Sequence, residues 1–224
     1  MNVLQRTPQW YQDRLGIPTA SRMDDATAKI NSASRKRYMA ELLIERRTGK
    51  SFPYFENEAM RWGIEHEPAA LAAYSFTRNV AVEPAPFVRH PALASGASPD
   101  GYVGTEGLVE AKCPTPGVTL ERLEAMASDN EPAVYADYRK QLQWQLECTG
   151  RQWVDFVSYD PRWSLEDQLI VCRVPRDDKL IERLHDDVAE FIADLDEREA
   201  RLRAWRGGRS YLLEQLKAVA NESG

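Results

Sequence analysis

The chain has few cysteines and no long run of apolar residues. Its three cysteines, Cys113, Cys148 and Cys172, are far apart and form no Cys-x-x-Cys pair, so neither a disulfide framework nor a zinc site is indicated. No stretch approaches the roughly 18 consecutive apolar residues of a membrane-spanning helix. The opening residues, MNVLQRTPQWYQDR, lack the apolar core of a secretion signal. We therefore expect a cytoplasmic protein that has no membrane partner.

The chain also lacks a general excess of positive charge. Its net charge is −6, which argues against a broad basic coat for nucleic acid. The first 50 residues nevertheless carry ten Lys or Arg against five Asp or Glu, a net of +5, which leaves −11 for the rest. A local basic surface in an acidic protein suits phosphate contacts in a confined channel. A chance asymmetry explains the same counts equally well.

The pattern of polar and apolar residues predicts one domain of mixed secondary structure. The expected helices lie at about 8–15, 19–30, 34–48, 56–77, 132–148 and 176–205, and the expected strands near 80–89, 93–97, 99–103, 108–113, 152–159 and 167–174. This order predicts an α/β or α+β fold with a central mixed sheet flanked by helices. Residues 1–206 would form the domain. We expect Gly207 and Gly208 to separate it from a short amphipathic tail at 207–224.

Two carboxylates and a lysine are the most informative residues. In ASPDGYVGTEGLVEAKCP, Gly104 and Gly107 centre a hairpin near Thr105, which returns Asp100 opposite Glu110. Opposed Cβ atoms lie about 4.5–5.5 Å apart. Alternation then puts Glu110 and Lys112 on one face of the strand.

Carboxylates this close repel each other unless a cation lies between them, and oxygen ligands suit Mg²⁺ or Mn²⁺. A neighbouring lysine is well placed to orient or activate a water. The pattern therefore favours a metal-dependent phosphodiesterase site. An ordinary turn followed by a solvated strand face is the alternative for so short a motif.

Glu67 is a candidate third carboxylate. It falls between Ile64 and Leu71 on a helical stripe that we expect to be buried, which consists of Met60, Ile64, Leu71 and Tyr74. A carboxylate at such a position is costly unless it is paired or binds a metal. A buried salt bridge to an arginine is the alternative. Pro68 follows directly, so a kink or restart of the helix is also expected.

Other residues suggest contacts to phosphate. Arg14 lies with Trp10 and Tyr11 on one short helical turn, and Ser21 lies in the first turn of the next expected helix. A guanidinium fork and the free N–H groups of a helix start both suit a terminal phosphate. The alternative is a surface charge and a simple helix cap. Polar contacts are also available from three glutamines on the helix at 132–148, which are Gln141, Gln143 and Gln145.

Seven ordered motifs resemble the family of the phage lambda exonuclease, the YqaJ-type viral recombinases. They span about residues 10–202 and read WYQDRLGIPTAS at 10–21, WGIEHE at 62–67, SPDG at 98–101, EAKCP at 110–114, QLQW at 141–144, YDPR at 159–162 and EFI at 190–192. His66 and Pro68 flank Glu67 and depart from the lambda pattern, and the segment after Arg206 lies outside the resemblance.

The resemblance implies a restriction-endonuclease-like core and a Mg²⁺-dependent 5′→3′ exonuclease that acts on linear double-stranded DNA. Such enzymes release 5′-mononucleotides and leave a 3′ single-stranded tail. Two Mg²⁺ ions are implied, for which Mn²⁺ would substitute. The implied partners are DNA ends, two further copies of the chain in a ring-shaped homotrimer, and a single-strand annealing protein. The host would be a bacterial or phage-infected cell.

The resemblance also assigns residue roles. Asp100, Glu110 and the backbone carbonyl of Ala111 would bind metal, Glu67 would complete the second ion's shell, and Lys112 would position or deprotonate the attacking water. Arg14 and Ser21 would hold the 5′-phosphate, while Ser98 and Gln143 would contact the DNA backbone. Two alternatives remain open at this point, a site-specific endonuclease of the same fold and a non-catalytic protein that binds DNA ends.

Overall fold

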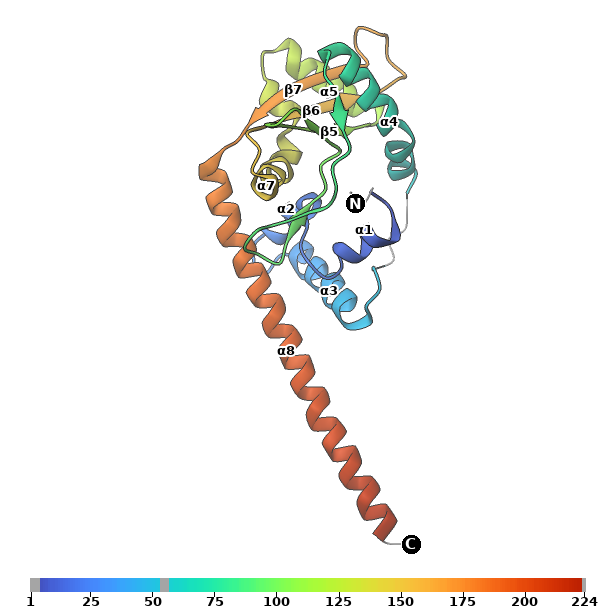
Figure 1. The fold of residues 1–224 in the computed structure, drawn as a ribbon, viewed down its shortest axis with the longest axis vertical. Helices are drawn as coiled ribbons and strands as arrows, with labels where there is room; N and C mark the ends of the chain where they lie inside the picture. The colour runs from blue at the N-terminus through green and yellow to red at the C-terminus, as the bar shows by residue number, and fades with distance from the viewer. Residues whose placement is uncertain (1–4, 53–56, 223–224) are drawn as a thin grey trace.

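A five-stranded mixed sheet forms the centre of the protein in the computed structural model, which describes residues 5–52 and 57–222 (Figure 1). The strand order is β1-β4-β5-β6-β7, for Val82–Glu83, Gly101–Val103, Gly107–Lys112, Trp153–Tyr159 and Leu169–Pro175. Only β5 and β6 pair in parallel, and the other neighbours are antiparallel. A separate short pair joins β2 (Val88–Arg89) to β3 (Gly96–Ala97). The expectation of a central mixed sheet is confirmed.

Helices cover both faces of this sheet. The first part of the chain forms α1 (Pro8–Asp13), η1 (Ala20–Arg22), α2 (Met23–Ala26), α3 (Ala33–Thr48) and α4 (Glu58–Arg78). The later helices are α5 (Pro116–Ala127), α6 (Glu131–Val134), η2 (Ala136–Tyr138), α7 (Arg139–Thr149) and α8 (Asp178–Glu222). None of the helices in the described ranges is both long enough and apolar enough to span a membrane.

Strand β5 has a core on each side because its side chains alternate. Leu108 packs with Leu142 and Leu146 of α7, whereas Val109 packs with Ala70 and Tyr74 of α4. A third core joins the N-terminal helices to α7 and α8 through fully buried Tyr38, Trp144 and Phe191. The strand with the candidate carboxylates is therefore fixed on both faces.

Several expected elements differ in extent. The strands expected at 80–89 and 93–97 reduce to three two-residue pieces, and the helix expected at 19–30 is only η1 and α2. The helix expected at 132–148 is divided into α6, η2 and α7. Helix α5 was not predicted, because Pro114, Pro116 and Gly117 resemble a loop. Pro116 in fact occupies the first turn of α5, where a missing N–H costs nothing.

Helix α4 runs through Pro68 without a break, so the expected restart is wrong. Its start was expected at Glu56, which lies outside the described residues, and the helix begins at Glu58 after the N-cap Asn57. Met60 and Ile64 are 43% and 36% exposed, so the first half of the supposed buried stripe faces solvent. Only the part around Ala70 and Tyr74 enters the core.

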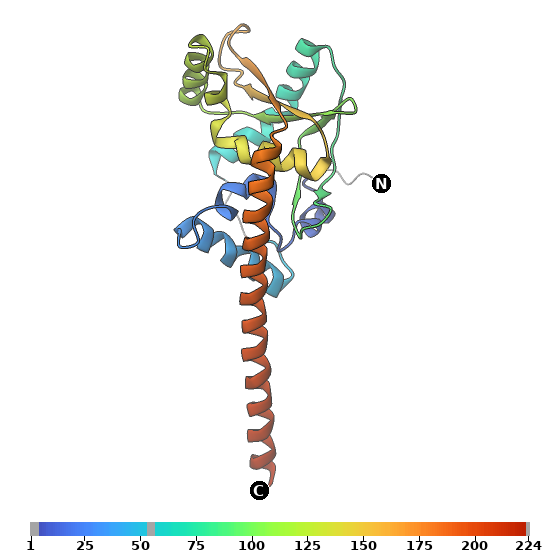
Figure 2. The same cartoon turned by 90° about the vertical axis from the view of Figure 1, so that its left-hand side faces the viewer.

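Helix α8 continues through Gly207 and Gly208, so the expected break there is wrong. Two glycines weaken a helix but do not prevent it when nothing competes for the backbone. The second half of α8 extends well away from the rest of the molecule (Figures 1 and 2). The assignment of residues 207–224 as a tail with a separate role stays a prediction.

Candidate active site

The β4–β5 hairpin places Asp100 beside Glu110. The register pairs Gly101 with Val109, so the next position along brings Asp100 opposite Glu110, as expected from the sequence. Gly104 takes the left-handed conformation that the turn requires, with a φ of 55°. Asp100 Oδ2 accepts a hydrogen bond of 2.8 Å from the backbone N–H of Ala111. The hairpin and the carboxylate are thereby fixed to each other.

Glu110 is 2% exposed and is held by three donors. Lys112 Nζ lies 2.5 Å from Oε1, and Gln141 Nε2 lies 2.5 Å from the same oxygen. Gln145 Nε2 donates to Oε2 over 2.7 Å. Gln141 and Gln145 are four residues apart on α7, so both face the strand. They keep a buried carboxylate hydrogen-bonded and fix its orientation.

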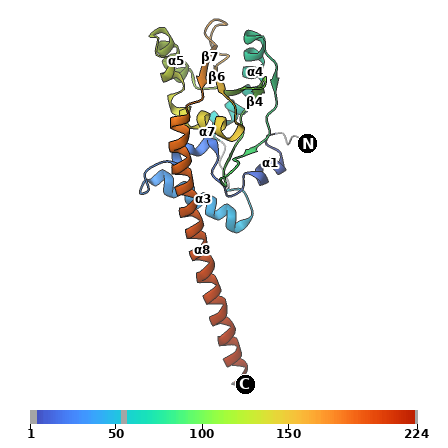
Figure 3. The ribbon, with the colours of Figure 1, turned by 60° about the vertical axis from the view of Figure 1, so that its left-hand side comes forward.

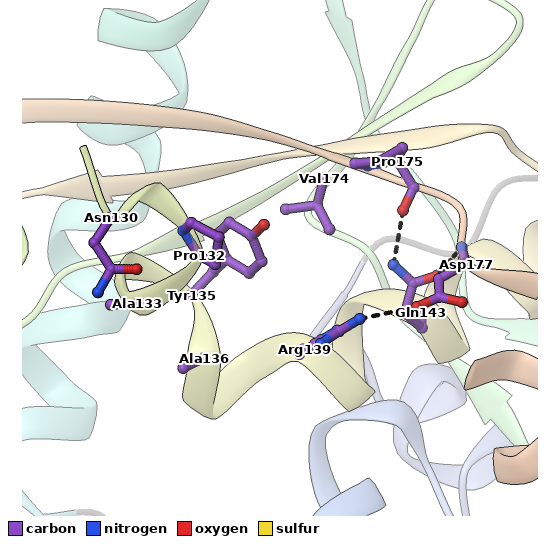
Figure 4. A pocket seen from close by; sticks show the side chains of 10 residues that line it. All are labelled: Asn130, Pro132, Ala133, Tyr135, Ala136, Arg139, Gln143, Val174, Pro175 and Asp177. Atoms are coloured by element: carbon purple, nitrogen blue, oxygen red, sulfur yellow. Dashed lines mark hydrogen bonds and ion pairs between the residues drawn. The ribbon is translucent and has the colours of Figure 1, made fainter. Parts of the chain in front are cut away.

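Gln143 does not reach this site, contrary to the role expected for it. Successive helical residues are rotated by about 100°, so Gln143 faces away from Gln141 and Gln145. It is 1% exposed, donates to the carbonyl of Pro175 over 2.9 Å and accepts from the N–H of Asp177 over 2.8 Å. Figure 4 shows it there, at one end of a separate hollow of about 520 Å³. Gln143 joins α7 to the start of α8, and Gln141 and Gln145 are the glutamines at the carboxylates.

The charges at the site shift two pKa values strongly. Burial and the negative charge of Glu110 raise the pKa of Asp100 well above its ordinary value, although Lys112 partly offsets this. Burial alone would lower the pKa of Lys112, but Glu110 and Asp100 raise it above its ordinary value. Lys112 is therefore an ammonium at neutral pH in this arrangement. The two carboxylates need more positive charge than one lysine supplies.

Glu67, the third candidate carboxylate, lies on α4 rather than on the hairpin. Its side chain is 23% exposed and forms an ion pair of 2.6 Å with Arg6. The alternative of a salt bridge to an arginine therefore describes Glu67 in this structure, although the pair is not buried. The negative charge of Glu67 is still close enough to contribute to the raised pKa of Asp100.

The residues expected to bind phosphate do come together. Arg14 lies over the Trp10 ring, 3.9 Å from its centroid, and its Nη1 is 3.3 Å from Ser98 Oγ. Trp10 Nε1 donates to the same hydroxyl over 2.9 Å. The other guanidinium nitrogen is 3.5 Å from Thr19 Oγ1, which in turn is 3.5 Å from Ser21 Oγ. Arg14 and the hydroxyls of three residues therefore form one cluster. One of these residues, Ser98, lies two positions before Asp100 in the chain.

A cleft of about 1290 Å³ connects these groups. Its lining includes Arg14, Ser21, Glu67, Ala111 and Lys112, so the candidate phosphate contacts and the candidate catalytic residues share one space. The views in Figures 1 and 3 place α1 and α3 on the side of the body from which α8 extends, and α4 toward the opposite side, beside the sheet.

Three cleft residues escaped the sequence reasoning. Arg6 belongs to none of the sequence motifs considered above. Arg162 lies over the Trp62 ring, 4.1 Å from its centroid, and is hydrogen-bonded to fully buried Asp160. The YDPR motif at 159–162 was the available signal for Arg162, and WGIEHE was the signal for Trp62.

The donor set suits a hard divalent cation. Asp100, Glu110 and Glu67 offer carboxylate oxygens and Ala111 a backbone carbonyl, which are ligand types that Mg²⁺ takes. The raised pKa of Asp100 shows that added positive charge would favour its ionised form. Within the described part of the chain, no three His, Cys, Asp or Glu side chains already enclose an ion position. Glu67 pairs with Arg6 and Glu110 with Lys112, so both must be shared or released on binding.

A central mixed sheet that carries carboxylates and a lysine on one strand, beside a cleft lined by an arginine and hydroxyls suited to phosphate, is typical of a class of nucleases. The family model for the YqaJ-like viral recombinase domain matches residues 9–152. Because this match covers more than half of the chain, the protein belongs to the YqaJ-like viral recombinase family.

Solved structures agree with this assignment. The alkaline exonuclease LHK-Exo of Laribacter hongkongensis is 39% identical, with a TM-score of 0.80 over 90% of this chain and 99% of that one. Its complex with dAMP matches equally well, with a TM-score of 0.81. A phage-related exonuclease from Haemophilus somnus 129PT is 15% identical, with a TM-score of 0.65 over 83% of this chain and 96% of that one, and shares the fold. The comparison with curated proteins gave no match. The family and these neighbours support a nuclease.

Proposed function

We propose that the protein is a Mg²⁺-dependent exonuclease that degrades linear double-stranded DNA from its 5′ ends. It would release 5′-mononucleotides and leave 3′ single-stranded tails for recombination by strand annealing. The observation that carries the proposal is the common cleft, which is lined by Arg14 and Ser21 as well as by Lys112 and Glu67, with Ser98 bonded to Arg14 beside it. A terminal phosphate held at Arg14 would bring the first phosphodiester toward Lys112. The cleft also accords with a relative whose structure was solved with dAMP.

Each residue has a task in this proposal. Asp100, Glu110, Glu67 and the carbonyl of Ala111 would hold two Mg²⁺ ions, for which Mn²⁺ would substitute. The ions would supply charge neutralisation at the attacking and leaving oxygens. Gln141 and Gln145 keep Glu110 oriented. Lys112, 26% exposed at its side chain and 5.2 Å from the Tyr138 ring centroid, can donate to the attacking water and fix its position.

A ring-shaped homotrimer is part of the same proposal. A closed ring stays on its substrate without base-specific contacts, because topology retains the duplex. This would suit a cleft whose polar residues are suited to phosphate rather than to base edges. A single-strand annealing protein is the proposed partner that takes up the 3′ tail.

Digestion of a linear duplex beside a closed circular duplex tests the proposed function. The linear substrate carries 5′-phosphates and a 3′ label, and both reactions contain Mg²⁺. Loss of the 5′-ended strand with release of mononucleotides and an intact circle is the expected result. Cutting of the circle would instead establish an endonuclease. Binding of ends without cleavage of either substrate would establish a recruitment protein.

Replacing Arg6 by alanine is expected to raise the affinity of the site for metal. Arg6 holds a carboxylate that the proposed ion needs, so binding must first break their ion pair of 2.6 Å. Exposed pairs contribute about 0.2–1 kcal/mol, and the Arg6 side chain is 40% exposed, so a gain of about 1.4- to fivefold is expected. Titration of Mn²⁺ followed by electron paramagnetic resonance measures this without any turnover.

A matched control for this measurement is Arg78→Ala, at the C-terminal end of α4. Arg78 donates to the carbonyl of Val171 and lies outside the cleft lining. Its removal changes the net charge by the same amount, so it reports any general effect of charge on Mn²⁺ affinity. Equal affinities in the Arg6 and Arg78 variants would show that Arg6 does not compete with the metal.

A further inference from the structure

The second half of α8 has no part in the site described above. Among the described side chains of α8, the last to be fully buried in the body is Leu195, whereas Leu202 is 43% exposed and Trp205 and Tyr211 are each 63% exposed. All three figures that show the whole chain place this half of the helix clear of the other elements (Figures 1–3). We refer to residues 198–211 as the distal segment.

The charge of α8 changes sign where the helix leaves the body. Residues 186–197 contain six Asp or Glu and no Lys or Arg, a net of −6. The distal segment contains five Arg and one Glu, a net of +4. The two adjacent segments of the helix therefore offer opposite charge to whatever they contact.

The acidic segment is used inside the molecule. Arg35 of α3 pairs with Glu190 over 3.3 Å and with Asp194 over 2.8 Å. Arg46 of the same helix pairs with Asp196 over 2.6 Å. These contacts fix α8 on α3 and account for three of the six acids of residues 186–197.

The positive charge of the distal segment is only partly balanced, since Arg201 pairs with Glu197 of the acidic segment over 3.7 Å. Its one acid, Glu199, already interacts with both Arg46 and Arg203. The side chains of Arg201 and Arg203 are 67% and 70% exposed. The segment is therefore a strongly positive surface directed at solvent.

One face of the distal segment combines arginine with an aromatic ring. Arg198, Leu202, Trp205 and Arg209 are spaced by four, three and four residues, which places them on one side of the helix. The Arg209 guanidinium lies 5.2 Å from the centroid of the Trp205 ring. From Arg198 to Arg209 the face extends about 16 Å along the axis, enough for several phosphates of one strand.

The arginines on this face also argue against pairing of the face with the same helix of a second chain. In a parallel pair, Arg198 and Arg209 would lie at the inward positions opposite their own copies, where apolar residues are needed. Positive charge next to an exposed ring instead matches the chemistry of single-stranded nucleic acid, whose phosphates take the arginines while an unpaired base stacks on the ring.

We propose that the distal segment binds single-stranded DNA, with Arg198 and Arg209 on the backbone and Trp205 stacked on a base. The single strand would be the 3′ tail that digestion leaves, and this identification rests on the proposed function. The binding itself follows from the charge and exposure of the segment alone.

Binding of a fluorescent oligothymidylate by the full chain, in buffer with EDTA and at several salt concentrations, tests the proposal. Arg198→Glu with Arg209→Glu is expected to weaken binding about tenfold and to reduce the slope of log affinity against log salt by about 1.4, near 0.7 for each contact. Trp205→Ala is expected to weaken binding about tenfold with little change in slope, and Trp205→Phe to retain it.

The matched control is Lys179→Glu with Arg183→Glu. These exposed residues lie on the same helix beside the body, and the double change alters the charge by the same amount. If the distal and control variants bind alike, the proposal is overturned. It is also overturned if the distal variants lose an oligomer in sedimentation, or bind DNA normally but lose binding to anionic phosphatidylglycerol vesicles.

The result of this binding test can be distinguished from the result of the cleavage test of the proposed function. Cleavage of linear duplex by the unaltered chain, with unchanged oligonucleotide binding in the distal variants, would remove only this inference. Loss of binding in those variants, together with no cleavage by the unaltered chain, would retain the inference and remove the exonuclease.

Discussion

Replacement of Lys112 by alanine is expected to lower kcat by about 10²- to 10⁴-fold, the usual contribution of a positioned proton donor or acceptor. The side chain lines the cleft and lies 2.5 Å from Glu110, so it can reach a water held beside that carboxylate. The fold should tolerate the change, since Gln141 and Gln145 still donate to Glu110. Single-turnover cleavage in Mg²⁺ measures the loss, and affinity for a duplex end in EDTA should stay within about twofold, a range typical of surface changes.

Lys112→Arg separates two roles for this lysine. The negative charges of Glu110 and Asp100 raise the pKa of Lys112 despite its burial, so it enters the reaction as an ammonium unless those charges are neutralised. Arginine keeps the charge but cannot release a proton. Partial activity in Lys112→Arg would indicate that the side chain orients water, and complete loss would indicate proton transfer. Lys179→Ala serves as the control, and an active Lys112→Ala enzyme would remove the lysine from the mechanism.

The hairpin was predictable because its determinants are local. Glycines at 104 and 107 fix the turn, and a period of two fixes which residues face each other, so the opposition of Asp100 and Glu110 followed from about 13 residues of sequence. The parallel neighbour β6 and the covering helices pack against this hairpin but do not set its register. Local rules give such pairs whenever the turn is unambiguous.

The choice among the glutamines was not predictable in the same way. All three lie within one turn and a half of α7, and only the rotation of that helix against β5 decides which ones reach Glu110. The rotation is set by Leu142 and Leu146, which pack on Leu108. Gln141 and Gln145 flank that packed stripe, whereas Gln143 points toward Pro175. A contact between distant segments therefore fixed a role that the motif alone left ambiguous.

Arg6 and the exposed part of α4 were missed for a related reason. An apolar stripe on a helix predicts a buried face, but Met60 and Ile64 line the cleft, where substrate rather than protein would cover them. The pairing of Arg6 with Glu67 joins residues 61 positions apart, and no periodic pattern links them. Sequence patterns identify faces of elements, and the tertiary structure decides what each face meets.

Replacement of Arg14 by alanine is expected to lower the preference for 5′-phosphorylated over 5′-hydroxyl duplex ends by about tenfold to a hundredfold, since hydrogen bonds to charged groups contribute about 1.5–3 kcal/mol. The Arg14 contacts to Ser98 and Thr19 are long, at 3.3 and 3.5 Å, so these two hydrogen bonds are readily exchanged for bonds to a phosphate. The measured quantity is the ratio of kcat/KM for the two ends.

A ratio is the right quantity because both ends meet the same enzyme, so any change in folding or in metal binding cancels. Arg14→Lys keeps the charge but loses the planar fork and its stacking on Trp10, and an intermediate ratio is expected. Arg22→Ala is the matched control, since Arg22 lines the same cleft but is bonded to Asp25 and Glu41. If Arg14→Ala retains the full preference while the cleavage itself persists, the phosphate must be held elsewhere in the cleft, and the alignment of the scissile bond with Lys112 would have to be derived from that other contact.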